Sequence, residues 1–155
     1  MVWEQDHRIP YFCFAYIMKE KLVIVPTYNE AENIEELVAD VMALVCPFDM
    51  LVVDDDSPDG TAQLVEALQT KYKDRLHLLK RQKKEGLGPA YVEAFRWALD
   101  RNYMYLFEMD ADFSHDPSYL PKLLEKKGPN NFIIGSRFCE GAKSDYKGFR
   151  KAISV

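Results

Sequence analysis

The chain has 155 residues, of which 48% are hydrophobic and 29% are charged, and its formal net charge is −5. This length suits a single domain with a substantial core. The acidic balance argues against general nucleic-acid binding, which needs a basic surface, so we expect no nucleic-acid partner. The longest apolar run, residues 11–17, is shorter than the roughly 18–20 residues that cross a bilayer.

The three cysteines, Cys13, Cys46 and Cys139, are far apart and odd in number, which favours neither a disulfide framework nor a zinc site. We expect free, at least partly buried thiols in a cytoplasmic chain. Residues 1–17 are rich in aromatics and lack helical or strand periodicity. We predict an N-terminal extension there and one domain over residues 18–155, and both an extension upstream of a start at Met18 and an ordinary N-terminal arm fit this pattern.

From Lys21 onward, short apolar runs alternate with segments of helical periodicity. Residues 22–25 are apolar in succession, which is typical of a strand covered on both faces. A helix is predicted next, with Asn29 as its N-cap and Glu32 three residues later. Its apolar face is expected to carry Ile34, Leu37, Val38, Val41, Met42 and Val45, and Cys46-Pro47 ends it.

Later apolar runs predict strands at residues 51–53, 76–79, 103–109 and 132–134. The helices between them begin near Asp59 or Thr61, near Pro89 and at Pro117. This alternation predicts an α/β fold, with a doubly wound, mainly parallel sheet and helices on both faces. In such sheets, ligands bind beyond the carboxyl ends of the strands.

Four of the predicted strands end in polar or charged residues, at 26–30, 54–56, 110–112 and 135–137. Asp110 and Asp112 lie on alternate residues, and carboxylate oxygens are ligands that Mg²⁺ and Mn²⁺ prefer. An isolated pair of this kind is as often a turn or a helix cap, but its place among four such strand ends favours a metal site. His115 fits either a neighbour of the metal or a turn histidine.

The acidic run 54–56 concentrates negative charge that a cation or hydrogen-bond donors would relieve, or it forms a solvated turn. The basic residues before the glycines at 86 and 88 suggest two different roles. We expect Arg81 on a solvated face, whereas we assign Lys84 to the binding of an anionic ligand. Arg137 and Arg150 are expected to neutralise a diphosphate.

Five segments together carry a resemblance to a known group of enzymes: 21–30 (KLVIVPTYNE), 51–59 (LVVDDDSPD), 86–91 (GLGPAY), 109–117 (MDADFSHDP) and 135–138 (GSRF). Over residues 19–154 the chain resembles the polyprenol-phosphate (dolichol-phosphate) mannosyltransferases, which are inverting family 2 glycosyltransferases with the Rossmann-like GT-A fold. The resemblance implies transfer of mannose from GDP-mannose to a polyprenyl or dolichyl phosphate, with Mg²⁺ or Mn²⁺ as cofactor.

The resemblance also implies roles for individual residues. It places a guanosine pocket at Pro26, Tyr28, Glu30 and Asp55. It assigns the metal and the donor diphosphate to Asp110 and Asp112, with Ser114 as a further metal-site residue. It implies that Arg137 and Arg150 hold the donor diphosphate or the acceptor phosphate. The predicted catalytic residues are therefore Asp112, Arg137 and Arg150.

A lipid-linked acceptor implies peripheral contact with the cytoplasmic face of a membrane. Members of the family are longer, and residues 139–147 lack their glycine pair and tryptophan, so we expect the domain to be incomplete at its C-terminus. Other interpretations stay open: a family member that uses UDP-glucose, or a donor-binding fragment without transfer activity. An alternative from a different class is a receiver-like domain with an acidic Mg²⁺ pocket. Such a domain would have a lysine at the end of a late strand, where this sequence has Arg137.

Overall fold

The computed structural model describes residues 20–126, 128 and 133–135, and the chain divides into two compact units, Met1–Ser118 and Tyr119–Val155. The first unit contains four strands, β1 (Lys21–Thr27), β2 (Asp49–Asp54), β3 (Leu76–Lys80) and β4 (Tyr105–Glu108). They form one parallel sheet in the order β3-β2-β1-β4. The order therefore reverses between β1 and β4.

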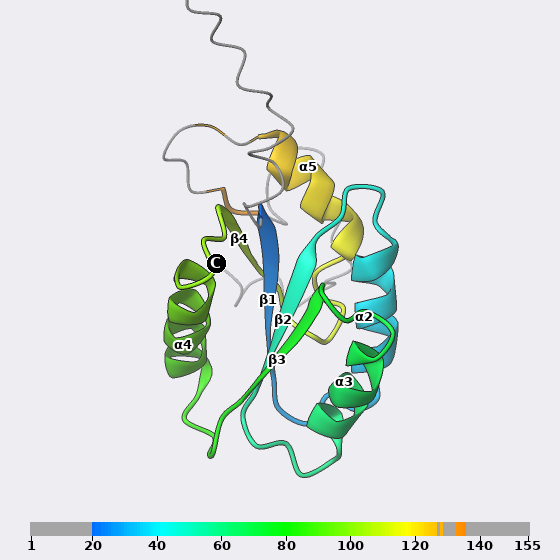
Figure 1. The fold of residues 1–155 in the computed structure, drawn as a ribbon, viewed down its shortest axis with the longest axis vertical. Coiled ribbons are helices and arrows are strands. Elements are labelled where there is room, and N and C mark those ends of the chain that lie inside the picture. Colours follow the sequence, from blue (N-terminus) through cyan, green and yellow to red (C-terminus); the bar gives the residue numbers. More distant parts are fainter. Residues whose placement is uncertain (1–19, 127, 129–132, 136–155) are drawn as a thin grey trace, which may run out of the picture. The chain divides into compact units, whose positions relative to one another are not determined.

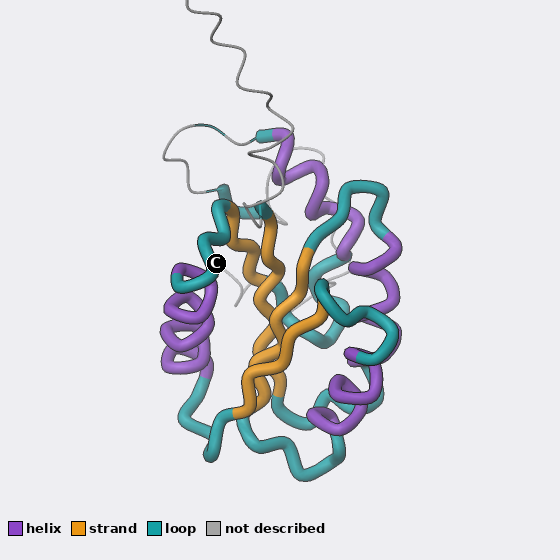
Figure 2. Tube along the Cα trace, in the orientation of Figure 1, coloured by secondary structure: helices purple, strands orange, loops and turns teal. Residues whose placement is uncertain are grey.

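Three helices of this unit cover the two faces of the sheet: α2 (Ile34–Ala43), α3 (Thr61–Gln69) and α4 (Leu87–Leu99). Figures 1 and 2 show α2 and α3 together on one face and α4 on the other. The chain moves one way across the sheet through α2 and α3 and returns through α4, so all crossovers have the same hand. The expected doubly wound α/β fold with helices on both faces is confirmed.

Burial on both faces explains why β1 and β2 are continuous apolar runs in the sequence. On one face, Leu22 and Ile24 of β1 and Leu51 and Val53 of β2 form a buried cluster with α4, which contributes Ala90, Ala94 and Ala98 at four-residue spacing. The alternate residues of β1, Val23 and Val25, are also fully buried. Because successive side chains point to opposite faces of a strand, both faces of β1 are covered.

The first helix differs from its predicted bounds at both ends. It begins at Ile34 with Asn33 as N-cap, whereas the predicted cap, Asn29, adopts a positive φ of 61° in the preceding loop. The helix ends at Ala43, so Val45 is fully exposed and not on the apolar face. The prediction was wrong at Asn29 because this residue belongs to a turn whose hydrogen-bond partners lie in a different loop.

The other predicted helix starts agree with the structure. The Asp59 carboxylate accepts a hydrogen bond of 3.0 Å from the backbone N–H of Thr61, the first residue of α3, although Gly60 is the cap position. Pro89 lies in the first turn of α4. Pro117 begins a 3-10 turn, η1 (Pro117–Tyr119), which leads into α5 (Leu120–Glu125).

The predicted fifth strand at 132–134 is not found where the structure describes it. Ile133 and Ile134 have no regular secondary structure, and Phe132 lies outside the described residues. The apolar run is short, and such runs do not by themselves distinguish a strand from other conformations.

Cys46 is a free, partly buried thiol as predicted, and its Sγ accepts a hydrogen bond of 3.4 Å from Lys21 Nζ. Cys13 and Cys139 lie outside the described residues, as does the predicted boundary between residues 17 and 18. Over the part of the chain that the structure describes, no helix is both long and apolar enough to span a bilayer.

Candidate functional site

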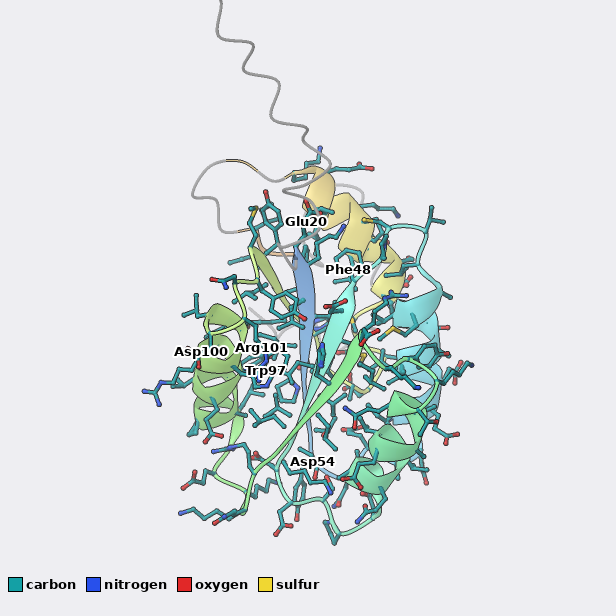
Figure 3. The ribbon with its side chains drawn as sticks, viewed as in Figure 1. Glu20, Phe48, Asp54, Trp97, Asp100 and Arg101 are labelled. Atoms are coloured by element: carbon teal, nitrogen blue, oxygen red, sulfur yellow. The ribbon has the colours of Figure 1, made fainter. Side chains whose placement is uncertain are left out.

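All four strands run in parallel, so their carboxyl ends share one edge of the sheet. In register, Thr27 pairs with Asp54, Asp54 with Lys80, and Ile24 with Glu108. The loops that follow these strands therefore start side by side at this edge. Figure 3 shows Asp54 at this end of the sheet, with Glu20 and Phe48 at the other. The reversal between β1 and β4 makes this edge the place where a doubly wound sheet binds ligands.

The loop after β1 is fastened to the loop after β2 by side chains. The consecutive backbone N–H groups of residues 29–31 donate hydrogen bonds of 3.0–3.1 Å to the side chains of Ser57, Thr61 and Asp59, respectively. These three acceptors satisfy backbone donors that no helix or strand pairs. An open depression lies between the two loops, lined by Asn29, Ala31, Glu32, Pro58 and Asp59.

Each aspartate of the acidic run 54–56 has a different environment. Asp54 is buried and accepts hydrogen bonds from the hydroxyl of Thr27 (3.0 Å) and from the N–H (3.0 Å) and hydroxyl (2.5 Å) of Ser57. Asp55 is buried against Arg81, and Asp56 is exposed with a positive φ of 61°. Hydrogen-bond donors and the Arg81 cation thus offset the repulsion among the three carboxylates. Asp54 also connects the end of β1, through Thr27, with the loop after β2, through Ser57.

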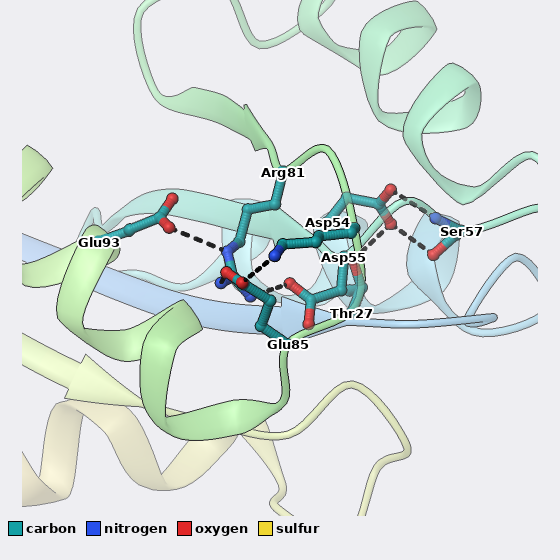
Figure 4. A network of polar contacts seen from close by, with 8 residues as sticks. Thr27, Asp54, Asp55, Ser57, Arg81, Glu85 and Glu93 are labelled. Carbon is teal, nitrogen blue, oxygen red and sulfur yellow. Dashed lines mark hydrogen bonds and ion pairs between the residues drawn. The ribbon is translucent and has the colours of Figure 1, made fainter.

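Arg81 is the buried centre of an ionic cluster, drawn in Figure 4. Its side chain is only 3% exposed, and its guanidinium donates from Nη1 to Asp55, from Nη2 to Glu85 (2.9 Å) and from Nε to Glu93 (3.2 Å). Burial disfavours the charged form, but the hydrogen bond and attraction of Asp55, followed by those of Glu93, outweigh it and raise the pKa of Arg81. The charge is therefore permanent.

The prediction of a solvated Arg81 was wrong. In sequence the residue begins a basic stretch, and its partners Asp55 and Glu93 are distant along the chain. Parallel pairing of β3 with β2 brings the ends of the two strands together, and the backbone N–H of Arg81 donates to the carbonyl of Asp54 (2.8 Å). The sequence did contain a signal for this ion pair: Arg81 directly follows β3, and Asp55 directly follows the neighbouring strand β2.

Lys84 lies next to Tyr28, another of the predicted binding residues. Its Nζ is 3.5 Å from the centroid of the Tyr28 ring, close enough for a cation–π interaction. Pro26 lies within β1 opposite Val53, and Glu30 accepts a hydrogen bond of 2.9 Å from the Asn33 amide. Pro26 near the end of β1, Tyr28 and Glu30 in the loop that follows, and Lys84 in the loop after β3 thus share the carboxyl edge.

The loop after β4 carries the two aspartates of the predicted metal site. Asp112 accepts a hydrogen bond of 2.9 Å from the backbone N–H of Ser114. Hydrogen bonds from this N–H and from the Ser114 hydroxyl hold the pKa of Asp112 below its usual value. Phe113 between them has a positive φ of 58°, which is rare for an aromatic residue and marks a tightly specified turn.

His115 is a turn histidine in this structure. Its Nδ1 accepts a hydrogen bond of 3.2 Å from the backbone N–H of Asp110, and it lies 3.9 Å from the Asp110 carboxylate. With Nδ1 as acceptor, the neutral ring carries its proton on Nε2. Of the two alternatives for His115, the structure supports the hydrogen-bonded turn.

The donor set of this loop fits a hard divalent cation. Asp110 and Asp112 supply carboxylate oxygens, and Asp112 is held in its ionised form. Mg²⁺ is commonly bound by one or two carboxylates together with substrate phosphates, not by a cage made of protein alone. Across residues 20–126, 128 and 133–135, no three His, Cys, Asp or Glu side chains form such a cage.

Tyr91 of α4 is a neighbour of this loop that the sequence did not single out. Burial raises the pKa of its phenol, and the nearby carboxylates of Glu108 and Asp110 raise it further. The hydroxyl therefore stays protonated and remains a hydrogen-bond donor close to the loop after β4. The predicted residues Arg137 and Arg150 lie outside the described residues.

Comparisons with known proteins place the chain in a family. The profile of the family "Glycosyl transferase family 2" matches residues 22–153. The chain belongs to glycosyl transferase family 2. It is 44% identical over 134 residues to the undecaprenyl-phosphate mannosyltransferase of Micrococcus luteus, covering 86% of this chain and 55% of that protein. It is 46% identical over 121 residues to the polyprenol monophosphomannose synthase of Mycolicibacterium smegmatis, covering 77% and 46%.

Among solved structures, this family 2 chain is similar to S. aureus TarS 1-349 in complex with UDP. The TM-score is 0.53 at 31% sequence identity, over 60% of this chain and 27% of that one. The expected similarity to polyprenol-phosphate mannosyltransferases and the expected GT-A class of fold are confirmed. The chain spans about half the length of the curated relatives it matches.

Proposed function

We propose that the chain forms the donor-binding part of a metal-dependent glycosyltransferase that moves mannose from GDP-mannose to a polyprenyl or dolichyl phosphate. One observation carries the proposal: the motifs after β1, β2, β3 and β4 meet at the carboxyl edge beside the switch between β1 and β4. Relatives at 44–46% identity, which are named as mannosyl-transferring enzymes of polyprenyl phosphates, support the choice of sugar and acceptor.

The guanosine of the donor would bind between the loops after β1 and β2. Tyr28 offers an aromatic ring for stacking, because this residue is 37% exposed. Asp55 and Glu30 offer carboxylate oxygens for the base or the ribose. Lys84, held over the Tyr28 ring, supplies positive charge at the same place for the donor's phosphates.

The diphosphate would bind at the loop after β4, where Asp110, Asp112 and Ser114 would hold Mg²⁺ or Mn²⁺. When bound, this ion would offset the negative charge that develops on the departing nucleoside diphosphate. The low pKa of Asp112 keeps its carboxylate available for the ion throughout the neutral range. Arg137 and Arg150 are proposed to hold the donor diphosphate or the acceptor phosphate.

The reaction we propose is a single displacement. An oxygen of the acceptor phosphate attacks the anomeric carbon of mannose, the bond from that carbon to the diphosphate oxygen breaks, and the configuration inverts. A phosphate monoester is already anionic near neutral pH, so the attack requires no base from the enzyme. A lipid-linked acceptor also places the site at a membrane surface, as a peripheral contact on the cytoplasmic face.

A second candidate is a family member that uses a uridine nucleotide, and the similarity to a TarS structure that contains UDP supports it. Titration calorimetry with GDP-mannose and UDP-glucose, each with Mg²⁺, Mn²⁺ or EDTA, separates the two. We expect GDP-mannose to bind more tightly than UDP-glucose, and more tightly with either metal than with EDTA. Tighter binding of UDP-glucose would reject the mannosyl assignment.

Transfer itself needs a separate test, with radiolabelled GDP-mannose and dolichyl phosphate in detergent. Labelled lipid product would show that this chain completes the reaction. Donor binding without product would identify it as a donor-binding part that depends on further residues. Vesicle flotation with and without dolichyl phosphate would test the membrane contact, and recovery of the chain only in the vesicle-free fraction would reject it.

A further inference from the structure

Lys84 carries a positive charge that forms no ion pair with the residues that the structure describes. The lysine beside it is paired, because Lys83 Nζ lies 2.7 Å from the Glu85 carboxylate. Among the described residues, the partner of Lys84 is instead the ring of Tyr28, whose centroid lies 3.5 Å from Nζ. The ammonium group therefore rests directly on one face of this ring.

The backbone next to Lys84 is attached to the buried Arg81, but the Lys84 side chain is not. Glu85, the next residue, accepts a hydrogen bond of 2.9 Å from Arg81 Nη2, and Lys83 contacts the other oxygen of the same carboxylate. Lys84 itself is exposed. The flexible four-carbon stem of a lysine can therefore carry the ammonium group from the Tyr28 ring to another partner while the loop after β3 stays in place.

The contact between Lys84 and Tyr28 competes with any ligand that stacks on the same face of the ring. Such a ligand needs the space that the ammonium group occupies, so it must displace Lys84. A cation–π contact at an exposed site changes an equilibrium constant by a factor of about two to five. A stacking ligand that offers Lys84 no new partner should therefore bind more weakly by about this factor.

We propose that Lys84 is a specificity-determining residue that covers the Tyr28 ring in the ligand-free chain and moves to the phosphates when a nucleotide binds, so that the site disfavours nucleosides. This inference rests on the proposed function, in which the donor's base stacks on Tyr28. It adds a role in the ligand-free chain, where the lysine opposes binding of the uncharged part of the donor.

The two kinds of ligand differ in what they give back to Lys84. A nucleotide exchanges the aromatic ring for phosphate oxygens, and contacts between an ammonium group and a phosphate are charge-assisted and strong. A nucleoside displaces the same ammonium group into water. Because a ligand shifts a conformational equilibrium only through its different affinities for the two states, one side chain has opposite effects on the two ligands.

The test measures the dissociation constants of GDP and guanosine for the whole chain, by NMR titration with Mg²⁺ at neutral pH. If UDP binds more tightly than GDP, UDP and uridine take their place. Lys84→Ala is expected to tighten nucleoside binding by about two- to fivefold, because the ring is uncovered. The same substitution is expected to weaken nucleotide binding by about tenfold, because a charge-assisted contact is lost.

Two further variants separate the position of the charge from its presence. Lys84→Arg keeps a cation that also stacks on aromatic rings, so both constants should stay within about twofold of the wild type. Lys83→Ala is the matched control, since this lysine is 73% exposed and pairs with Glu85. It should leave both constants within about twofold of the wild type as well.

The chemical shifts of the lysine side chain report the covered state directly. Protons above an aromatic ring are shifted upfield, so the ε-methylene protons of Lys84 should resonate upfield of those of Lys83 in the ligand-free chain. Tyr28→Leu should abolish this difference, and so should saturation with the nucleotide. This measurement decides the matter even where nucleoside binding is too weak to give a constant.

The outcomes separate the inference from the function on which it rests. Weaker nucleotide binding by Lys84→Ala without tighter nucleoside binding, or ε-methylene protons of Lys84 without an upfield shift, overturns the inference while nucleotide binding stands. Failure of the wild type to bind GDP and UDP overturns the proposed function together with the inference.

Discussion

At the scale of single residues, the carboxylates at the carboxyl edge divide into those that join loops and those that face outward. Asp54 and Asp59 use their oxygens on Thr27, Ser57 and backbone N–H groups of neighbouring loops. Asp112 is exposed, and the hydrogen bonds that it accepts come from Ser114 in the same turn. The first group should govern stability and the second ligand binding.

Asp112→Ala is expected to weaken binding of GDP-mannose with Mg²⁺ or Mn²⁺ by at least about tenfold, because it removes a proposed direct ligand of the ion. Calorimetry measures this change. With EDTA, wild type and variant should bind the donor equally weakly. Asp74→Ala, an exposed aspartate before β3, is the matched control and should bind as the wild type does. Equal binding by Asp112→Ala and wild type in the presence of metal would contradict the metal site.

Asp59→Ala is expected to lower the free energy of unfolding by about 1 kcal/mol, because it removes the acceptor for the backbone N–H groups of Thr61, at the start of α3, and of Ala31. Burial raises the pKa of Asp59, but the hydrogen bonds from the Thr61 side chain, the Ala31 N–H and the Thr61 N–H outweigh it, and the pKa is lowered.

The lowered pKa sets the pH dependence of this effect. The stabilisation is fully present above the unfolded-state pKa of about 4 and is lost as the pH falls through the lower folded-state value. Urea unfolding at several pH values should therefore show a constant difference between wild type and Asp59→Ala from pH 7 to 5, and a shrinking one below. A difference that grows on acidification would contradict a stabilising role of the ionised Asp59 carboxylate.

Residue patterns indicated candidate loops at the strand ends, but they did not predict how the charges of these loops pair. The alternate aspartates, Lys84 and the acidic run were all identified from the sequence. The buried position of Arg81 was not, because a basic stretch resembles a solvated surface until the pairing of β2 with β3 is known. Likewise, nothing local distinguishes Asp54, which holds the turn, from Asp55, which does not.

At the scale of elements, α4 approaches the sheet through small side chains. Ala90, Ala94 and Ala98 are each no more than 1% exposed and contact the apolar face of β1 and β2. Alanine at these positions lets the helix backbone lie close to the strands. The same helix positions Glu93 against Arg81 and Tyr91 near Asp110, so its distance from the sheet matters for the site.

Ala94→Leu is expected to lower the free energy of unfolding by about 1–3 kcal/mol, because the larger side chain overpacks the contact between α4 and the sheet. Chemical denaturation measures the loss. Val92→Leu, on the exposed side of the same helix, is the control and should change stability by no more than about 0.5 kcal/mol. Equal stability of Ala94→Leu and wild type would contradict close packing between α4 and the sheet.

Element boundaries were predicted less well than element types. The alternation of apolar runs and helical periodicity identified four strands and the helices between them, since each buries a well-defined face. Asn29 and Val45 were misplaced because the signals for capping and periodicity are local, whereas the loop after β1 is held by side chains of the loop after β2.

At the scale of the whole molecule, ligand binding should be coupled to folding, because the site is built from loops of four strands. GDP-mannose with Mg²⁺ is expected to raise the melting temperature, with a stabilisation of about 2.7 kcal/mol at a donor concentration of 100 times the dissociation constant. Differential scanning fluorimetry measures the shift. EDTA should reduce it, and a shift of the same size with EDTA would contradict metal-dependent binding.

The class of fold followed from the sequence because few arrangements satisfy the rules for parallel sheets. Alternating strands and helices with same-handed crossovers restrict the chain to doubly wound forms. The strand order, and with it the position of the reversal, did not follow, because no local pattern tells β4 to pair with β1 and not with β3.

That pairing also determines when the site comes into existence during folding. Lys21 at the start of β1 pairs with Tyr105, the first residue of β4, so this contact closes a loop that contains all of β2, β3 and the first three helices of the sheet unit. Contacts between residues so distant in sequence form late, because the entropy of loop closure must be overcome first. A chain emerging from the ribosome would therefore assemble β1, β2 and β3 first. The proposed donor site would be complete only after β4 has been synthesised and paired.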